Sequence, residues 1–291
     1  MKRALVTGGA GFLGSFIADS LTAEGYEVVI YDRRPSSFLQ AGQTMIVGDI
    51  LDTEALGSAA DGAQVVFHLA AAADINTAAA NPTETAQTNV LGTVHALEAA
   101  HAARAERFVL ASTVYVYSRA GGFYRCSKQA CEAYVEEFQR QYGLDYTVLR
   151  YGSLYGPRTD NSNGVHRLLR QAFEAGEVVH DGSPDDSREY IHVQDAARLS
   201  VKALEPEFAN QHLTLSGHHP MRLRDLFTMF SEILGREVEI EYQEPGESHY
   251  RITPYAFSPR VGRKLTATSY VDMGQGLLQV LEEIHGTEGA G

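Results

Sequence analysis

The nine residues VTGGAGFLG, at positions 6–14, follow a short apolar run and open a helical pattern. Gly8, Gly11 and Gly14 recur every three residues at the point where a strand would turn into a helix. Glycine there permits a tight turn, lets a pyrophosphate approach the backbone and lets the helix pack on the strand, while the helix N-terminus attracts an anion. The stretch therefore predicts a dinucleotide-binding loop.

The second apolar run supports this interpretation because it ends in an acid. Asp32, in YDRR at 31–34, lies 18 residues after Gly14 and can accept hydrogen bonds from an adenosine ribose. The competing interpretation is a tight turn followed by a solvated acid. Arg33 and Arg34 could instead stack on adenine or bind a 2′-phosphate, so the sequence favours NAD and leaves NADP open.

The pattern around this loop predicts the fold. Up to about residue 150, short apolar runs alternate with amphipathic segments, which indicates βαβ units and a parallel sheet covered on both faces. Strands are expected at 3–7, 26–32, 44–49, 64–70, 107–112 and 145–150, and helices from 12, after 52, at 83–103 and from 124. We therefore predict an α/β protein: a Rossmann-type doubly wound parallel sheet at 1–150, with returns from the later chain, and a smaller C-terminal α/β substrate lobe at 151–291. Late helices are expected near 222–234 and 272–284.

Composition limits the partners. The chain has 291 residues and a formal net charge of −13, without a run of lysines or arginines, which disfavours nucleic acid and anionic membranes. Cys126 and Cys131 have no histidine at metal-ligand spacing and indicate reduced thiols. No apolar stretch approaches about 18 residues, so we expect a cytoplasmic protein without an export signal or membrane span. GHHP at 217–220 lacks a partner carboxylate and His192 alternates as a strand residue, so no metal is expected.

A second segment carries candidate catalytic residues. FYRCSKQA at 123–130 places Tyr124 and Lys128 one helical turn apart, on one face of a helix. The ammonium, together with the positive ring of an oxidised nicotinamide, would lower the pKa of the tyrosine toward that of a general base. Thr113, at the end of the preceding strand, would hydrogen-bond the reacting oxygen. Such a Tyr–Lys pair is common by chance, but a preceding dinucleotide loop favours the catalytic interpretation.

Together these segments resemble the extended short-chain dehydrogenase/reductase family, in its branch of NAD-dependent nucleotide-sugar epimerases and dehydratases. The resemblance covers nearly the whole chain and rests on TGGAGFLG, GDI at 48–50, HLAA at 68–71, TNVLGT at 88–93, STVYVY at 112–117, YRCSK at 124–128, LRYGSLYGPR at 149–158 and REYIHVQDAA at 188–197. It implies an NAD site formed by Gly8, Gly11, Phe12, Leu13, Gly14, Asp32, Arg33, Asp49, Ile50, Leu69, Ala70, Ala71, Asn89, Tyr124, Lys128 and Tyr151. It also implies that Thr113, Ser153, Arg188 and Arg251 contact a nucleotide-sugar substrate.

The sequence departs from the family pattern around the sugar pocket. Only ten residues separate Thr113 from Tyr124, where relatives have a longer, proline-containing loop. Ser118 stands where glycine is usual, and Ser153 where many relatives have asparagine. Arg251 is a weaker match to a phosphate-binding arginine than Arg188, for which a surface ion pair with Asp185 or Asp186 is the alternative.

The residues after Thr113 separate the reaction types within this branch. Related dehydratases carry Asp-Glu there and related decarboxylases tend to carry a glutamate, whereas this chain has Val114 and Tyr115. Within the resemblance, this difference favours an NAD-dependent nucleotide-sugar 4-epimerase, similar to UDP-sugar 4-epimerases: an isomerase that works by transient oxidation at C4. The residues do not distinguish which sugar or which nucleotide it binds. An NAD(P)H-dependent reductase of a nucleotide-linked ketosugar and a non-catalytic dinucleotide sensor are the alternatives. The resemblance also implies a homodimer in which helices at 83–103 and 124–141 form a four-helix bundle.

Overall fold

The computed structural model describes residues 2–118 and 121–243. Arg251 and the helix expected at 272–284 lie outside these ranges. Within them, no helix is both long and apolar enough to cross a membrane.

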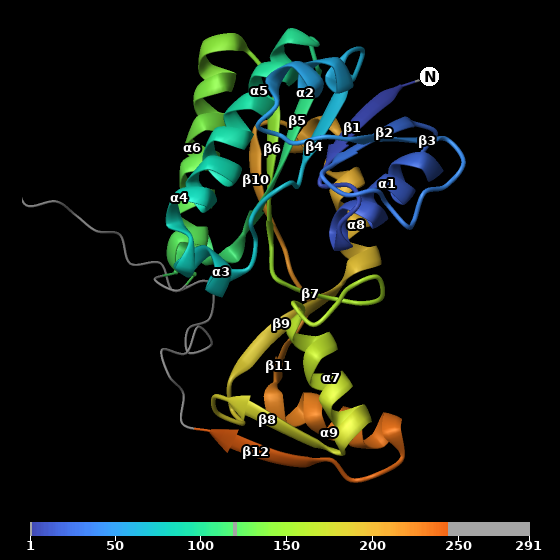
Figure 1. Ribbon diagram of the computed structural model, residues 1–291, viewed down its shortest axis with the longest axis vertical. Helices are drawn as coiled ribbons and strands as arrows, with labels where there is room; N and C mark the ends of the chain where they lie inside the picture. The colour runs from blue at the N-terminus through green and yellow to red at the C-terminus, as the bar shows by residue number, and fades with distance from the viewer. Residues whose placement is uncertain (1, 119–120, 244–291) are drawn as a thin grey trace, which may run out of the picture. The chain divides into compact units, whose positions relative to one another are not determined.

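A seven-stranded parallel sheet forms the first layer, in the order β10-β6-β5-β4-β1-β2-β3 (Figure 1). Its strands are β1 (Arg3–Thr7), β2 (Glu27–Asp32), β3 (Gln43–Val47), β4 (Val65–His68), β5 (Arg107–Thr113), β6 (Tyr146–Tyr151) and β10 (Gln211–Leu215). The order reverses between β1 and β4, where doubly wound sheets bind their ligands. The predicted Rossmann-type sheet is confirmed, and β10 is a return from the later chain that pairs with β6.

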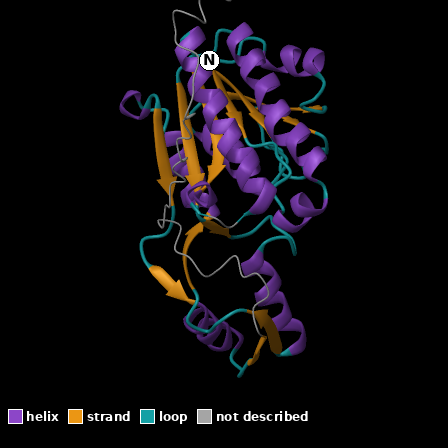
Figure 2. Ribbon diagram, turned by 90° about the vertical axis from the view of Figure 1, so that its left-hand side faces the viewer, coloured by secondary structure: helices purple, strands orange, loops and turns teal. Residues whose placement is uncertain are grey.

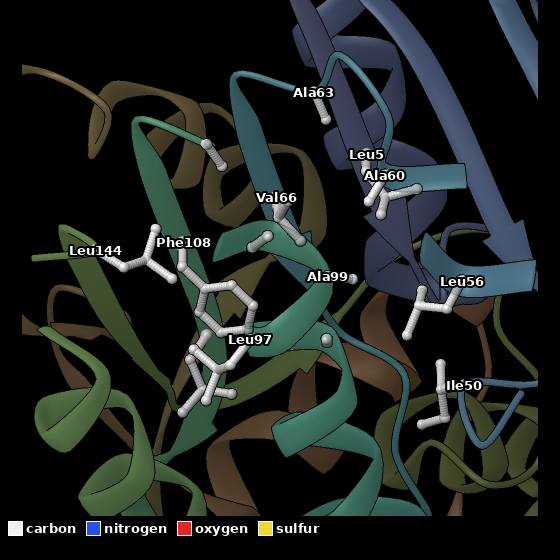
Figure 3. Packing of buried hydrophobic residues seen from close by; sticks show 14 of the residues in the cluster. Leu5, Ile50, Leu56, Ala60, Ala63, Val66, Leu97, Ala99, Phe108 and Leu144 are labelled. Carbon is white, nitrogen blue, oxygen red and sulfur yellow. The ribbon is translucent and has the colours of Figure 1, made fainter. Parts of the chain in front are cut away.

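Helices cover both faces of this sheet (Figure 2). On one face, α2 (Thr53–Ala60), α5 (Gly92–Ala102) and α6 (Gly122–Tyr142) contribute to a buried apolar cluster with the strands. Figure 3 shows part of it, with Leu97 beside Phe108 and Leu56 on the side of Leu5 and Ala60. On the other face, α1 (Phe12–Ala23) and α8 (Val193–Lys202) pack into a second cluster. Strands buried on both faces explain the continuous apolar runs in the sequence.

The helix expected at 83–103 is composite. After α3 (Ile75–Ala80), the chain forms α4 (Pro82–Thr85), a π-helical turn η1 (Ala86–Leu91) and then α5. Its extent agrees with the prediction, but its middle is not α-helical. Such π turns are often found at functional sites, and this one carries Asn89.

The remaining elements come from the part of the chain after β6. They are β7 (Ser153–Tyr155), α7 (Gly164–Ala175), β8 (Glu177–Asp181), β9 (Ser187–His192), the 3-10 turn η3 (Pro206–Phe208), β11 (Pro220–Arg222), α9 (Leu223–Leu234) and β12 (Glu239–Gln243). Residues of α7, β8, β9, β11, α9 and β12 form a separate apolar cluster. Strands β11, β9 and β7 form one sheet, and β12 and β8 form another. Leu168 and Ala172 of α7 pack with Phe227 and Phe230 of α9 in the cluster. These elements supply the side chains that face the end of β5.

Candidate functional site

A cavity of about 1090 Å³ opens at the carboxyl ends of the main sheet. Its lining includes Gly8, Gly11, Phe12, Leu13, Gly14, Asp32, Arg33, Asp49, Ile50, Leu69, Ala70, Ala71, Thr113, Tyr124, Lys128 and Tyr151. Residues at the ends of β1 to β6 therefore meet in one groove, and sixteen of the residues expected from the sequence lie on its wall.

The glycine loop lies so close to neighbouring backbone that side chains at Gly8 and Gly14 would clash with it. Gly8 has φ +72°, and a Cβ there would lie 2.6 Å from the backbone nitrogen of Ala70. A Cβ on Gly14 would overlap the carbonyl oxygen of Gly8. Gly11 occupies the N-cap of α1 without a side-chain cap, so the helix N-terminus faces the groove with free amides typical of a pyrophosphate site. The residues present thus fit a dinucleotide.

Asp32 ends β2 with its carboxylate fixed in place. Oδ2 accepts a hydrogen bond from the backbone nitrogen of Ala10 at 3.2 Å, and Oδ1 accepts one from that of Arg34, also at 3.2 Å. The hydroxyl of Tyr31 donates to the carbonyl of Asp49 at 2.8 Å and holds the segment that follows β3 against the groove. This end of the cavity has the acid and the apolar wall that an adenosine would need.

The three candidate catalytic residues lie at the other end of the groove. Thr113 ends β5, and Tyr124 and Lys128 lie in the first turns of α6. The Nζ atom of Lys128 donates to the carbonyl of Ala111 at 2.8 Å and lies 5.9 Å from the ring centroid of Tyr124. The fold thus brings the tyrosine, its neighbouring ammonium and a threonine hydroxyl to one wall, as the spacing in the sequence suggested.

Burial dominates the electrostatics of this pair. It raises the pKa of Tyr124, and it lowers the pKa of Lys128 against the opposing effects of Cys131 and Glu132. Burial therefore acts on the tyrosine in the direction opposite to that expected from the sequence. The sequence-based expectation was that Lys128 and the positive ring of a bound cofactor would together lower the pKa of the tyrosine.

A smaller cavity of about 230 Å³ shares Thr113, Tyr115 and Tyr151 with the large one. It is also lined by Ser153 and Arg188, whose Nη1 donates to the serine hydroxyl at 3.5 Å. The structure thus brings Ser153 and Arg188, two of the expected substrate residues, next to Thr113. The sequence had left open a surface ion pair between Arg188 and Asp185 or Asp186. Of these two acids, Asp185 forms an ion pair with Arg224.

Asn89 stands behind the wall of the large cavity. Its Oδ1 accepts from the backbone nitrogen of Ala72 at 2.7 Å, and its Nδ2 donates to the carbonyl of Ala72 at 3.1 Å and to Ser127 Oγ at 2.9 Å. Ser127 in turn donates to the carbonyl of Tyr124 at 2.8 Å. Asn89 therefore joins the wall of the cavity at Ala72 to helix α6, where the resemblance had implied direct contact with the cofactor.

A buried chain of hydrogen bonds supports the same wall. Thr7 Oγ1 lies 2.7 Å from His68 Nδ1, His68 Nε2 lies 3.1 Å from Thr93 Oγ1, and Thr93 Oγ1 donates to the carbonyl of Asn89 at 2.6 Å. Because the threonine proton goes to that carbonyl, the Nε2 atom of His68 is the donor and its Nδ1 is the acceptor. Burial, with the nearby charge of Lys128, lowers the pKa of His68 to about 3 and keeps it neutral.

The short connection after Thr113 forms the 3-10 turn η2 (Val114–Tyr117) and is fastened to α6. Arg125 Nη1 donates to the carbonyl of Ser118, and Gln129 Nε2 donates to that of Val116, each at 2.9 Å. These contacts hold the turn as a fixed part of the wall. Helix α6 begins two residues before Tyr124, at Gly122, where the sequence had suggested a start at the tyrosine itself.

Sequence reasoning missed a charged cluster behind this turn, which we call the Glu132–Arg150 network. Arg150 Nε and Nη2 donate to the two carboxylate oxygens of Glu132 at 3.0 and 2.6 Å, and Ser112 Oγ donates to Oε1 at 2.5 Å. Arg150 also stacks on Tyr117 at 4.5 Å and donates to its hydroxyl. Ser112 and Arg150 directly precede Thr113 and Tyr151, and Glu132 lies one helical turn beyond Lys128; these positions are the signal that the sequence offered.

In the described part of the chain, no group of three or more His, Cys, Asp or Glu side chains could hold a metal ion. His192 ends β9, and its Nδ1 accepts from the backbone nitrogen of Gln194 at 3.3 Å as the cap of α8. Cys126 and Cys131 are free thiols, the first exposed and the second buried.

Comparison with known proteins agrees with this geometry. The profile of the NAD dependent epimerase/dehydratase family matches residues 4–215. The UDP-glucose 4-epimerase of Thermotoga maritima, solved with UDP-glucose, is 30% identical with a TM-score of 0.80, and the match covers 86% of this chain and 88% of that one. The UDP-glucose 4-epimerase of Thermus thermophilus, solved with NAD, is 27% identical with a TM-score of 0.75, covering 90% and 95%.

The relatives also include another activity. UDP-N-acetyl-alpha-D-glucosaminuronate decarboxylase of Bacillus cytotoxicus is 26% identical over 300 residues, covering 94% of this chain and 92% of the relative. The proteins similar to this chain therefore catalyse more than one reaction, epimerisation and decarboxylation among them. The chain belongs to the NAD dependent epimerase/dehydratase family, and NAD is its cofactor.

Proposed function

We propose that the protein is an NAD-dependent nucleotide-sugar 4-epimerase. One observation carries this choice within the family: among the described residues that line the two cavities, the carboxylates are Asp32 and Asp49, at the adenosine end. The catalytic end has Thr113, Tyr115 and Tyr124 instead. Elimination of water needs an acid and a base besides the hydride acceptor, whereas epimerisation needs one proton carrier that works in both directions.

The side chains at the catalytic end can perform this exchange. Tyr124 accepts the proton of the sugar 4-hydroxyl and later returns it, while Thr113 hydrogen-bonds the same oxygen. Bound NAD supplies a reversible hydride acceptor. Lys128 holds positive charge beside the tyrosine and opposes the effect of burial on its pKa. In the smaller cavity, Arg188 is placed to bind a phosphate of the nucleotide, and Ser153 to hydrogen-bond the sugar.

The proposal is tested with a panel of UDP sugars suggested by solved relatives: UDP-glucose, UDP-glucuronic acid and UDP-N-acetylglucosamine. We expect one of them to be converted to its C4 epimer, of unchanged mass and without net consumption of added cofactor. Net oxidation of NAD(P)H would indicate the reductase, and loss of carbon dioxide the decarboxylase. Binding of NAD without conversion of any sugar would indicate the sensor.

The position of Asp32 predicts a preference between cofactors. Its fixed carboxylate can accept hydrogen bonds from a free ribose diol and repels a 2′-phosphate. We expect NADH to bind more tightly than NADPH, and Asp32→Asn to narrow the difference by removing the repulsion. Calorimetry on wild type and variant measures both affinities. Tighter binding of NADPH by the wild type would contradict the prediction and point to Arg33 as the residue that selects the cofactor.

We further propose a homodimer through α6 and the composite helix that ends in α5. On α6, Cys131 and Val135 are buried against the sheet, whereas Tyr134 and Tyr142 are 46% and 57% exposed, and Leu91 of η1 is 45% exposed. The apolar residues of α6 thus divide into a stripe for the sheet and a stripe left for a partner helix. Light scattering at micromolar concentration should give the mass of a dimer, and Tyr134→Glu should lower it. A monomeric wild type would reject the interface.

A further inference from the structure

Arg158 lies outside both cavities, just beyond β7, and joins three segments of the chain. Its guanidinium carbon lies 4.2 Å from the ring centroid of Phe16 in α1 and 4.7 Å from that of Phe38 in the segment between β2 and β3. Its Nη1 pairs with Asp19 of α1 at 2.7 Å. The arginine is thus held between two aromatic rings and a carboxylate, an arrangement we call the Arg158 clamp.

The backbone at this position indicates that these contacts are strong enough to impose a conformation. Arg158 has φ +65°, in the left-handed region that costs a residue with a Cβ about 1–2 kcal/mol. Its side chain and that of Asp19 are only 22% and 18% exposed. The other carboxylate oxygen of Asp19 accepts from Gln43 Nε2 at 3.0 Å, which places the start of β3 in the same cluster.

The clamp fastens a segment that has little other support. Within 33–42, every residue is exposed except Ser36 and Phe38, which are half-buried. The hydrogen bonds described for 33–40 stay within three residues along the chain. The stacking of Phe38 on Arg158 reaches a segment far away in the sequence and so fixes the middle of this loop.

The same loop forms one wall of the cofactor groove. Arg33 and Arg34 line the large cavity next to Asp32, whereas Phe38 and Arg158 do not. We infer that Arg158 is a positioning residue for the cofactor: through Phe38 it holds the 33–42 loop in place, so that the adenosine end is already formed when NAD binds. Ordering a flexible loop at the moment of binding would lower the affinity. The inference rests on the NAD site and is independent of the proposed epimerase activity.

The test measures binding of NADH to cofactor-free protein by fluorescence titration, together with its release rate. Arg158→Ala and Phe38→Ala should each weaken binding roughly 5- to 30-fold, the equivalent of a partly desolvated cation–π contact. Both changes break the same contact between Arg158 and Phe38. The affinity of the double variant for NADH should therefore be no lower than that of the single variant with the lower affinity. Arg158→Lys can keep the ion pair with Asp19, but its ammonium cannot stack flat against two rings, so it should restore only part of the affinity.

Arg198→Ala is the matched control. Arg198 lines the same surface hollow as Arg158, but it pairs with Asp195 of its own helix and its side chain is 71% exposed. Its removal should leave NADH affinity unchanged. The inference is overturned if Arg158→Ala lowers the melting temperature but binds NADH like wild type, or if the effects of Arg158→Ala and Phe38→Ala are additive. If Arg158→Ala does not fold, the inference is overturned when Phe38→Ala alone binds NADH with the affinity of the wild type.

Discussion

Tyr124→Phe is expected to lower turnover by a factor on the order of 10² to 10⁴, the usual contribution of a positioned general acid–base. The change removes only the phenol oxygen, so the ring keeps its place on α6, and neither the glycine loop nor Asp32 is touched. The expected phenotype is a folded protein that binds NADH like wild type and interconverts sugars slowly. Initial rates on the UDP sugar that the wild type converts, with NADH binding as the control, measure it.

Lys128→Met provides a contrast with this variant. Because Lys128 lies beside the tyrosine and is also one of the residues expected to bind NAD, its loss should reduce turnover and NADH affinity together. Equal turnover in wild type and Tyr124→Phe would contradict the catalytic assignment. The segment FYRCSKQA would then be only the start of a helix, and a dinucleotide sensor would become the better interpretation.

Breaking the Glu132–Arg150 network is expected to cause the largest loss of stability. The two side chains are only 9% and 13% exposed, and burial, which disfavours the charged form, lowers the pKa of Arg150. Removing one charge of such a buried pair leaves the other uncompensated, so Glu132→Gln should lower the free energy of unfolding by about 3–5 kcal/mol. Urea denaturation measures the change.

A matched surface pair separates the effect of burial from that of pairing. Arg170 and Glu174 form an ion pair with side chains 53% and 56% exposed, so Glu174→Gln should cost less than about 1 kcal/mol. Combining Glu132→Gln with Arg150→Met should cost less than the sum of the two single changes, because no unpaired charge remains. An equal cost for the buried and exposed variants would contradict the prediction that the burial of the Glu132–Arg150 network makes it important for stability.

The sequence was sufficient for features that depend on local pattern. Continuous apolar runs identified the strands that are buried on both faces, and the spacing of Gly8, Gly11 and Gly14 identified the turn into α1. Tyr124 and Lys128 share a wall because one helical turn separates them. In each case the information lies within a few neighbouring residues, and the structure agrees with it.

Features that depend on pairing between distant residues could not be obtained in this way. Glu132 lies in a helix whose neighbouring glutamates are exposed, and only the fold brings Arg150 to it. Nothing in TNVLGT distinguishes a π turn from an α-helix. Along the chain, strands β3 to β6 lie between Phe38 and Arg158. Their contact therefore arises from the tertiary structure alone.

Strand β10 imposes an order on the assembly of the molecule during protein synthesis. It is the outermost strand beside β6, yet the whole of 152–210 is translated between the two strands. During that interval the outer edge of β6 presents its amide and carbonyl groups without a partner strand, a condition that favours pairing with other chains. Helix α8, which packs on the α1 face, also leaves the ribosome late. The nucleotide-binding sheet therefore cannot close as a finished unit behind the ribosome, and its completion waits for the segment that carries Ser153 and Arg188, the residues proposed to bind the nucleotide sugar.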